Sequence, residues 1–186
     1  MRQPALRRTF IFSPVIILCL IYGGLVGLRV LYPMRFEGAI HVWSQERVLD
    51  PALVASVIRA ESRFRPTAVS PRGAVGLMQI MPETGIWLAS QVGIEAFSVD
   101  DLRDPEVNIR LGTWYLKYLV DRFGDLEVAL QAYNAGPTTA ERWRSDNAAP
   151  FPETVAYVDR VLTAVPVYRF LLRAPIVLRI TPSLPI

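Results

Sequence analysis

The sequence has very few of the side chains that most metal and nucleophile sites require. Its 186 residues include one cysteine (Cys19), one histidine (His41) and one lysine (Lys117). These counts exclude a disulfide framework, a Cys/His zinc site and a CxxC redox pair. A catalytic triad would have to use His41, and a Ser-Lys dyad would have to use Lys117. We therefore expect any catalysis to depend on carboxylates, hydroxyls, amides and the backbone, without a metal or an organic cofactor.

Acidic residues are absent from the first 36 positions. The formal net charge is +3, but five arginines precede residue 36 and all seventeen acids follow it. From residue 36 onward the acids outnumber the cations by two. A nucleic-acid-binding domain would show a basic face in this part of the chain. We therefore expect no nucleic-acid partner.

A long uncharged run marks the N-terminal segment. Three arginines among the first eight residues precede nineteen uncharged positions, 10–28. At about 1.5 Å per residue, a helix of this length nearly spans the hydrocarbon core of a bilayer. A cleaved signal peptide would have a shorter apolar core and a small-residue cleavage site, and no convincing site precedes Arg29. We therefore favour an uncleaved membrane anchor in residues 1–35, with its helix at about 10–31.

The distribution of arginine predicts the orientation of this anchor. More positive charge lies before the run than after it, where Arg29 and Arg35 stand close to Glu37. The positive-inside rule then keeps the N-terminus in the cytoplasm. In a bacterium this predicts a single-pass protein of the inner (cytoplasmic) membrane, with the rest of the chain on the periplasmic side.

Proline and glycine divide residues 36–173 into helices. No sustained alternation of apolar and polar residues marks a sheet, so we predict a mainly all-α domain. Asp50-Pro51 and Asp104-Pro105 each place a capping acid before a proline at the first helical position. The predicted helices begin or end at such signals and cover about 51–61, 82–92, 105–124, 125–134, a short helix around Trp143, and 152–172. The apolar, proline-containing tail, residues 174–186, stays unassigned.

One internal segment, residues 62–81, has no helical period. It contains two prolines and two glycines and follows directly on Glu61. Segments of this length without regular structure are uncommon in compact domains and are often functional. We therefore expect a long loop that carries part of a functional site.

Glu61 continues an apolar stripe on the predicted helix before this loop. It lies four residues after Val57, so it is on the same helix face. A carboxyl on an apolar face loses hydration, which favours its neutral form and raises its pKa. A carboxylic acid that stays protonated near neutral pH can act as the general acid in glycosidic bond cleavage. The alternative is an ordinary helix-end acid that pairs with Arg63 or Arg65.

Four short strings then occur in a fixed order along the chain. They are ES at 61–62, GLMQ at 76–79, AYNAGP at 132–137 and ET-x-x-YV at 153–158. With these strings the chain resembles the lytic transglycosylases that have an SLT-type, goose-lysozyme-like domain. The resemblance covers about residues 45–172. Each string is moderately specific alone, and the four in order make a strong signal.

The resemblance implies a lysozyme-like helical domain in residues 36–173 whose groove binds peptidoglycan glycan strands. It also implies non-hydrolytic cleavage between N-acetylmuramic acid and N-acetylglucosamine, which leaves 1,6-anhydromuramoyl ends. Glu61 matches the catalytic acid, which protonates the leaving oxygen and then takes a proton from the muramoyl 6-hydroxyl. A single carboxylate suffices because the nucleophile belongs to the substrate, unlike the two-carboxylate hydrolases.

The resemblance also implies a set of groove residues. The matching positions are Ser70, Gln79, Met81, Tyr133, Asn134 and Tyr157. Hydroxyl and amide groups suit sugar hydroxyls and N-acetyl groups, and a tyrosine ring can face a sugar while its hydroxyl reaches Glu61 or the substrate. The alternatives are loop capping for Ser70 and Asn134, and ordinary core packing for the two tyrosines and Met81.

Two other functions stay open from the sequence. A lysozyme-like hydrolase would need a second carboxylate to activate water, and Asp100, Asp101 and Asp104 are expected in a loop that could supply one. A catalytically silent glycan-binding or scaffold protein of an envelope complex would have little need for a buried acid at position 61. The chain also departs from the family at Val155, where many members carry arginine.

Overall fold

The computed structural model describes residues 9–173, which fall into two units. One unit contains helix α1 (Thr9–Leu31), whose stretch from Pro14 to Leu31 is long and apolar enough to cross a membrane. A signal sequence near an N-terminus would have the same length and composition. The other unit, Met34–Arg173, carries the remaining described helices. The predicted stub before Thr9 and the predicted tail, residues 174–186, lie outside the described residues.

The regular structure of the second unit is helical. Its elements are α2 (Glu37–Glu46), α3 (Pro51–Ser62), α4 (Pro82–Gln91), the short 3₁₀ helix η1 (Val99–Arg103), α5 (Pro105–Phe123), α6 (Leu126–Ala135), α7 (Pro137–Ser145) and α8 (Pro152–Arg173). Between residues 34 and 173 the β-type pairing is limited to isolated bridges from Val75 to Val69 and to Ile80. The predicted all-α class is confirmed.

Helix boundaries follow the capping signals in the sequence. The Asp50 carboxylate accepts a hydrogen bond from the Ala52 amide at 2.9 Å, and Asp104 caps α5 in the same way. Asp125 caps α6 through the Val128 amide, and Gly124 ends α5 with a φ of 67°. These side chains satisfy amide groups that have no partner inside their helices. The start of each of these helices was therefore predictable.

Two elements were not predicted. Helix α2 follows Phe36, which adopts a left-handed conformation and gives no side-chain cap, so its start has no sequence signal. The acids expected in a loop lie instead in or beside η1. There the Ser98 amide donates to the Asp101 carboxylate at 2.7 Å, which helps to close a capping box around the turn.

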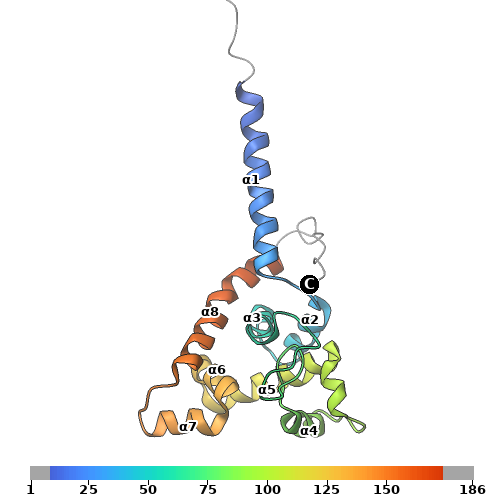
Figure 1. The fold of residues 1–186 in the computed structure, drawn as a ribbon, viewed down its shortest axis with the longest axis vertical. Coiled ribbons are helices and arrows are strands. Elements are labelled where there is room, and N and C mark those ends of the chain that lie inside the picture. Colours follow the sequence, from blue (N-terminus) through green and yellow to red (C-terminus); the bar gives the residue numbers. More distant parts are fainter. Residues whose placement is uncertain (1–8, 174–186) are drawn as a thin grey trace, which may run out of the picture. The chain divides into compact units, whose positions relative to one another are not determined.

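Helix α3 lies inside the domain and packs most extensively against α8 (Figure 1). Residues 52–58 are all buried, so the helix is covered on almost every side. The single apolar stripe predicted for this helix was therefore too narrow, because a helix that is buried on almost every side has no single apolar face. Towards its carboxyl-terminal end α3 is only partly buried, and Glu61 lies in this part of the helix.

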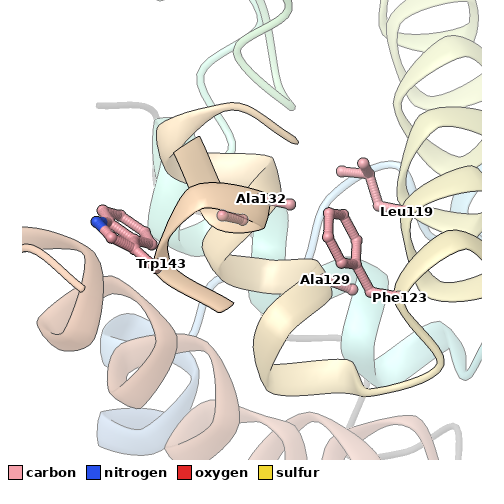
Figure 2. Close-up of a cluster of buried hydrophobic side chains, with 6 residues drawn as sticks. Leu119, Phe123, Ala129, Ala132 and Trp143 are labelled. Carbon is pink, nitrogen blue, oxygen red and sulfur yellow. The ribbon is translucent and has the colours of Figure 1, made fainter. Parts of the chain in front are cut away.

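A second packed region joins α5, α6 and α7. Figure 2 shows five of its buried side chains, Leu119 and Phe123 from α5, Ala129 and Ala132 from α6, and Trp143 from α7. The two small residues on α6 let the larger side chains approach from both sides. This packing holds the end of α6, with Tyr133 and Asn134, in a fixed position relative to α5.

Candidate active site

Glu61 occupies the last turn of α3, immediately before the chain leaves the helix. Arg63 and Phe64 then adopt left-handed conformations, with φ values of 53° and 62°, which turn the chain into the 62–81 loop. The buried Ser62 hydroxyl lies 2.8 Å from the Leu77 carbonyl oxygen and joins the end of α3 to the second half of the 62–81 loop. The ES pair therefore combines a carboxyl at the helix end with a hydroxyl that fixes the following loop.

The predicted long loop is confirmed, and its second half is buried and anchored by Asn108 of α5. The Asn108 side-chain amide donates to the Val75 and Leu102 carbonyl oxygens at 3.0 and 2.8 Å. Its oxygen accepts from the Met78 amide at 2.7 Å. Gly76 packs so closely here that a Cβ would lie 2.2 Å from the Asn108 amide nitrogen. Any larger residue at this position would clash with Asn108, and its φ of 84° also favours glycine.

Gln79 follows this anchor in a left-handed conformation, with a φ of 50°. Its side-chain nitrogen donates to the Gly76 and Ala68 carbonyl oxygens at 2.9 and 3.2 Å. The amide is therefore held by the loop's own backbone. A non-glycine residue held at positive φ is uncommon and indicates that the surrounding structure imposes the conformation.

A cleft of about 410 Å³ opens beside Glu61. Five of the six predicted groove residues line it, namely Ser70, Gln79, Met81, Tyr133 and Asn134. Glu61 is the only acidic residue among the described residues that line this cleft. A larger and shallower hollow of about 630 Å³ lies on α7, but its lining includes none of the predicted site residues.

Burial raises the pKa of Glu61 from its ordinary value of 4.5 to about 7. Loss of hydration is the main cause, because it penalises the ionised form. The Tyr157 hydroxyl and the positive charge of Arg160 act in the opposite direction and limit the rise in pKa. The carboxyl can therefore hold or release a proton near neutral pH, as an acid–base catalyst must.

The two predicted tyrosines have different positions. Tyr157 is buried and is not among the residues that line the cleft; its hydroxyl lies close enough to Glu61 to lower that pKa but makes no aligned hydrogen bond. Tyr133 lines the cleft, and its hydroxyl donates to the Met78 carbonyl oxygen at 2.8 Å. In this structure the Tyr133 hydroxyl therefore bonds to the loop backbone, while the prediction that a tyrosine hydroxyl reaches Glu61 or the substrate stays a prediction for this residue. Burial and the nearby Glu61 charge raise the pKa of both phenols well above 10.

Asn134 connects two of the sequence strings. Its side-chain oxygen accepts a hydrogen bond at 2.9 Å from the hydroxyl of Thr154, which is fully buried. This bond holds the side chain of the AYNAGP string against the ET string at the start of α8. Thr154 was not predicted as a site residue, although the ET string was the signal that could have identified it.

Sequence reasoning also missed part of the cleft lining. Arg72, Thr84 and Tyr115 contribute side chains to it, and the Ala135–Pro137 turn lines it as well. This turn is part of the AYNAGP string, but its residues were not among the predicted groove residues. Thr84 and Tyr115 carry no local signal, because α4 and α5 come to the cleft through tertiary packing.

The family comparison decides what this arrangement is. The model of the transglycosylase SLT domain matches residues 38–153, more than half of the chain. The chain belongs to the transglycosylase SLT-domain family. The matched range contains Glu61, the 62–81 loop and every residue that lines the cleft. Tyr157 lies four residues beyond it.

Three relatives place this SLT domain among known proteins. The soluble lytic murein transglycosylase of Escherichia coli K12 is 33% identical over 156 residues, which cover 77% of this chain and 24% of the relative. The endo-type membrane-bound lytic murein transglycosylase A of Klebsiella pneumoniae is 42% identical over 73 residues, covering 38% and 36% of the two chains. The X-ray structure of an inactive mutant of lytic transglycosylase Slt from Pseudomonas aeruginosa superposes with a TM-score of 0.73 at 34% identity, over 80% and 26% of the two chains.

The coverage is strongly asymmetric. The chain spans about a quarter of the length of the soluble relative and of the solved structure. The structural match supports the predicted lysozyme-like helical fold.

Proposed function

We propose that this chain is a membrane-anchored peptidoglycan lytic transglycosylase. The observation that carries the proposal is Glu61, a single acid in a cleft whose pKa is raised to about 7 by burial. The relatives named as lytic murein transglycosylases support the same activity. Ser70, Gln79, Met81, Tyr133 and Asn134 then bind the glycan strand, and the buried Tyr157 hydroxyl positions the Glu61 carboxyl.

In the first step protonated Glu61 donates its proton to the oxygen between N-acetylmuramic acid and N-acetylglucosamine. The bond from this oxygen to the anomeric carbon breaks, and N-acetylglucosamine leaves with the proton. Glu61 is then a carboxylate in a poorly hydrated site. Its remaining interactions with the Tyr157 hydroxyl and Arg160 favour that charged form.

In the second step the muramoyl 6-hydroxyl oxygen bonds to the anomeric carbon. The Glu61 carboxylate removes the proton of this hydroxyl and returns to its starting state. Atoms balance without water, because the nucleophile is part of the substrate. The product is a 1,6-anhydromuramoyl end, and one carboxyl serves as acid and then as base.

The positions of the other acids favour this reaction over hydrolysis. A hydrolase uses two carboxylates that flank the bond, one of which activates water or forms a covalent bond. The candidate acids at 100, 101 and 104 do not line the cleft. Asp100 pairs with Arg103, and Asp101 and Asp104 cap helices. None of these three carboxylates is therefore placed to act on a bond in the cleft.

The test is mass spectrometry of products released from purified sacculi by the full chain in detergent. We expect muropeptides with anhydro ends, each lighter by one water than a reducing end. Glu61→Gln is expected to lower the rate at least about 100-fold, since it removes the acid and the base. Glu95→Gln, a change at an exposed acid outside the cleft, is the matched control and retains activity. Reducing ends would instead indicate a hydrolase, and no release by the unmodified chain would indicate a binding protein.

We also propose that α1 anchors the chain in the bacterial inner membrane, with residues 34–173 in the periplasm. The length and composition of α1 and the arginines before it support this arrangement. Membranes washed with alkaline carbonate are expected to retain the chain. Protease added to spheroplasts is expected to digest the region after α1. Release by carbonate, or full protection from protease, would contradict the proposal.

A further inference from the structure

Five aromatic rings form a continuous series that begins in the cleft. Tyr133 and Tyr115 line the cleft, with ring centroids 5.5 Å apart. Tyr115 is stacked with Tyr118 at 6.4 Å, and Tyr118 with Trp114 at 5.6 Å. Trp87 of α4 meets Trp114, Tyr115 and Tyr118 edge-on, at 5.4, 6.3 and 5.6 Å. The series therefore joins the cleft to a surface formed by α4 and α5.

Helical spacing extends the series away from the cleft. Thr84 lines the cleft on α4, and Trp87 follows it by three residues on the same helix face. Tyr118 follows cleft-lining Tyr115 on α5 by the same interval. Each step is close to one helical turn, about 5 Å along the axis. Each helix thus carries an aromatic ring about one turn from a residue that lines the cleft.

The outer rings remain accessible to solvent. Trp87 is 39% exposed, and its neighbour Ile86 is 58% exposed. Trp114 and Tyr118 are half-buried. Of the two tryptophans in the series, Trp87 thus keeps a larger share of its ring in water than is needed to hold α4 on α5 through Trp114. The exposure of Trp87 leaves apolar ring surface free for a ligand.

We infer that Trp87, Trp114 and Tyr118, the outer platform, bind sugar rings of the glycan strand after it leaves the cleft. This inference rests on the proposed function. The cleft volume of about 410 Å³ is at the small end for ligand sites, so a polymeric substrate must continue outside it. The electron-rich face of an aromatic ring attracts the positively polarised C–H groups on the face of a sugar ring. Continuity with Tyr115 directs the strand onto the platform.

Binding is tested with the catalytically inactive full chain, Glu61→Gln, in detergent micelles. N-acetylglucosamine oligomers of two to eight sugars are added, and the four tryptophan indole N–H signals are followed by NMR. We expect the Trp87 and Trp114 signals to shift only with oligomers longer than the cleft holds. Trp43 and Trp143 act as internal controls. Equal small shifts at all four signals with the longest oligomer would overturn the inference.

Turnover provides a second measurement on the active chain. The double variant Trp87→Ala/Trp114→Ala is expected to lose about tenfold in kcat/KM on long glycan strands. Its kcat/KM on a tetrasaccharide fragment is expected to change less than twofold. Phe170→Ala, a matched change at an exposed aromatic residue of α8, should leave both values unaltered. An equal loss on long and short substrates would indicate that the rings serve packing alone.

Conservative variants separate binding from folding. Trp87→Phe and Trp114→Phe keep an aromatic face, so each is expected to retain the preference for long strands even if the alanine variant loses helical structure. If Glu61→Gln keeps full activity, the proposed function fails. If Glu61→Gln is inactive while the tryptophan variants show no dependence on strand length, only the outer platform is refuted.

Discussion

Replacing Glu61 by glutamine tests the physical basis of the site independently of any substrate. Glutamine has nearly the same shape but cannot ionise. In the unmodified protein burial costs the neutral carboxyl little free energy, whereas it destabilises the carboxylate. The two proteins should therefore have similar stability in acid and diverge as the pH rises.

The magnitude follows from the pKa of Glu61. The rise from 4.5 to about 7, at about 1.4 kcal/mol for each tenfold change in proton affinity, corresponds to about 3 kcal/mol. This stabilising contribution is fully present below pH 4.5 and is lost as the pH rises through 7. Relative to the unmodified chain, Glu61→Gln should therefore gain up to about 3 kcal/mol above pH 8. The opening of the cleft to water makes this value an upper limit.

Thermal unfolding followed by circular dichroism measures this difference. For a domain of this size about 3 kcal/mol corresponds to a Tm difference of about 10 °C at pH 8.5, falling towards zero at pH 4.5. Glu95→Gln serves as the control at an exposed acid and should shift Tm little at either pH. A Tm difference between Glu61→Gln and the unmodified chain that does not vary with pH would refute the argument that the carboxyl is desolvated.

Three further predictions concern the surroundings of Glu61. Tyr157→Phe removes a hydroxyl that lowers the Glu61 pKa, so the pKa should rise. Activity should then be lost at a higher pH than in the unmodified chain. An unchanged pH profile would contradict the contact. Asn108→Ala should lower the free energy of unfolding by about 2–4 kcal/mol, because the Met78 amide and two carbonyl groups lose their partner, and denaturant unfolding measures it. Gly112→Ala would place a Cβ 2.3 Å from the Met78 sulfur and should lower the free energy of unfolding by about 1–3 kcal/mol, again measured by denaturant unfolding. An unchanged free energy of unfolding would mean that the loop can move away.

Local signals determined much of the domain. The Asp-Pro caps at 50–51 and 104–105 gave the starts of α3 and α5, since a capping carboxylate acts within a few residues. The proline- and glycine-rich composition of residues 62–81 indicated a loop. The four ordered strings carried the resemblance to the family, and that resemblance implied five residues that line the cleft together with Glu61. Helix α2 had no such signal, because no side chain caps its N-terminus.

Other properties of the site depend on residues distant in the sequence. The spacing of apolar residues placed Glu61 at the end of a helix, but the rise of its pKa to about 7 comes from burial that the tertiary packing creates around the carboxyl. Similarly, Tyr133 was predicted as a groove residue, while its hydrogen bond to Met78 joins positions 55 apart. The sequence by itself determined which chemical groups are present and which helices carry them. The tertiary structure alone decided their hydration, their partners and the lining contributed by α4 and α5, because desolvation and packing act through space rather than along the chain.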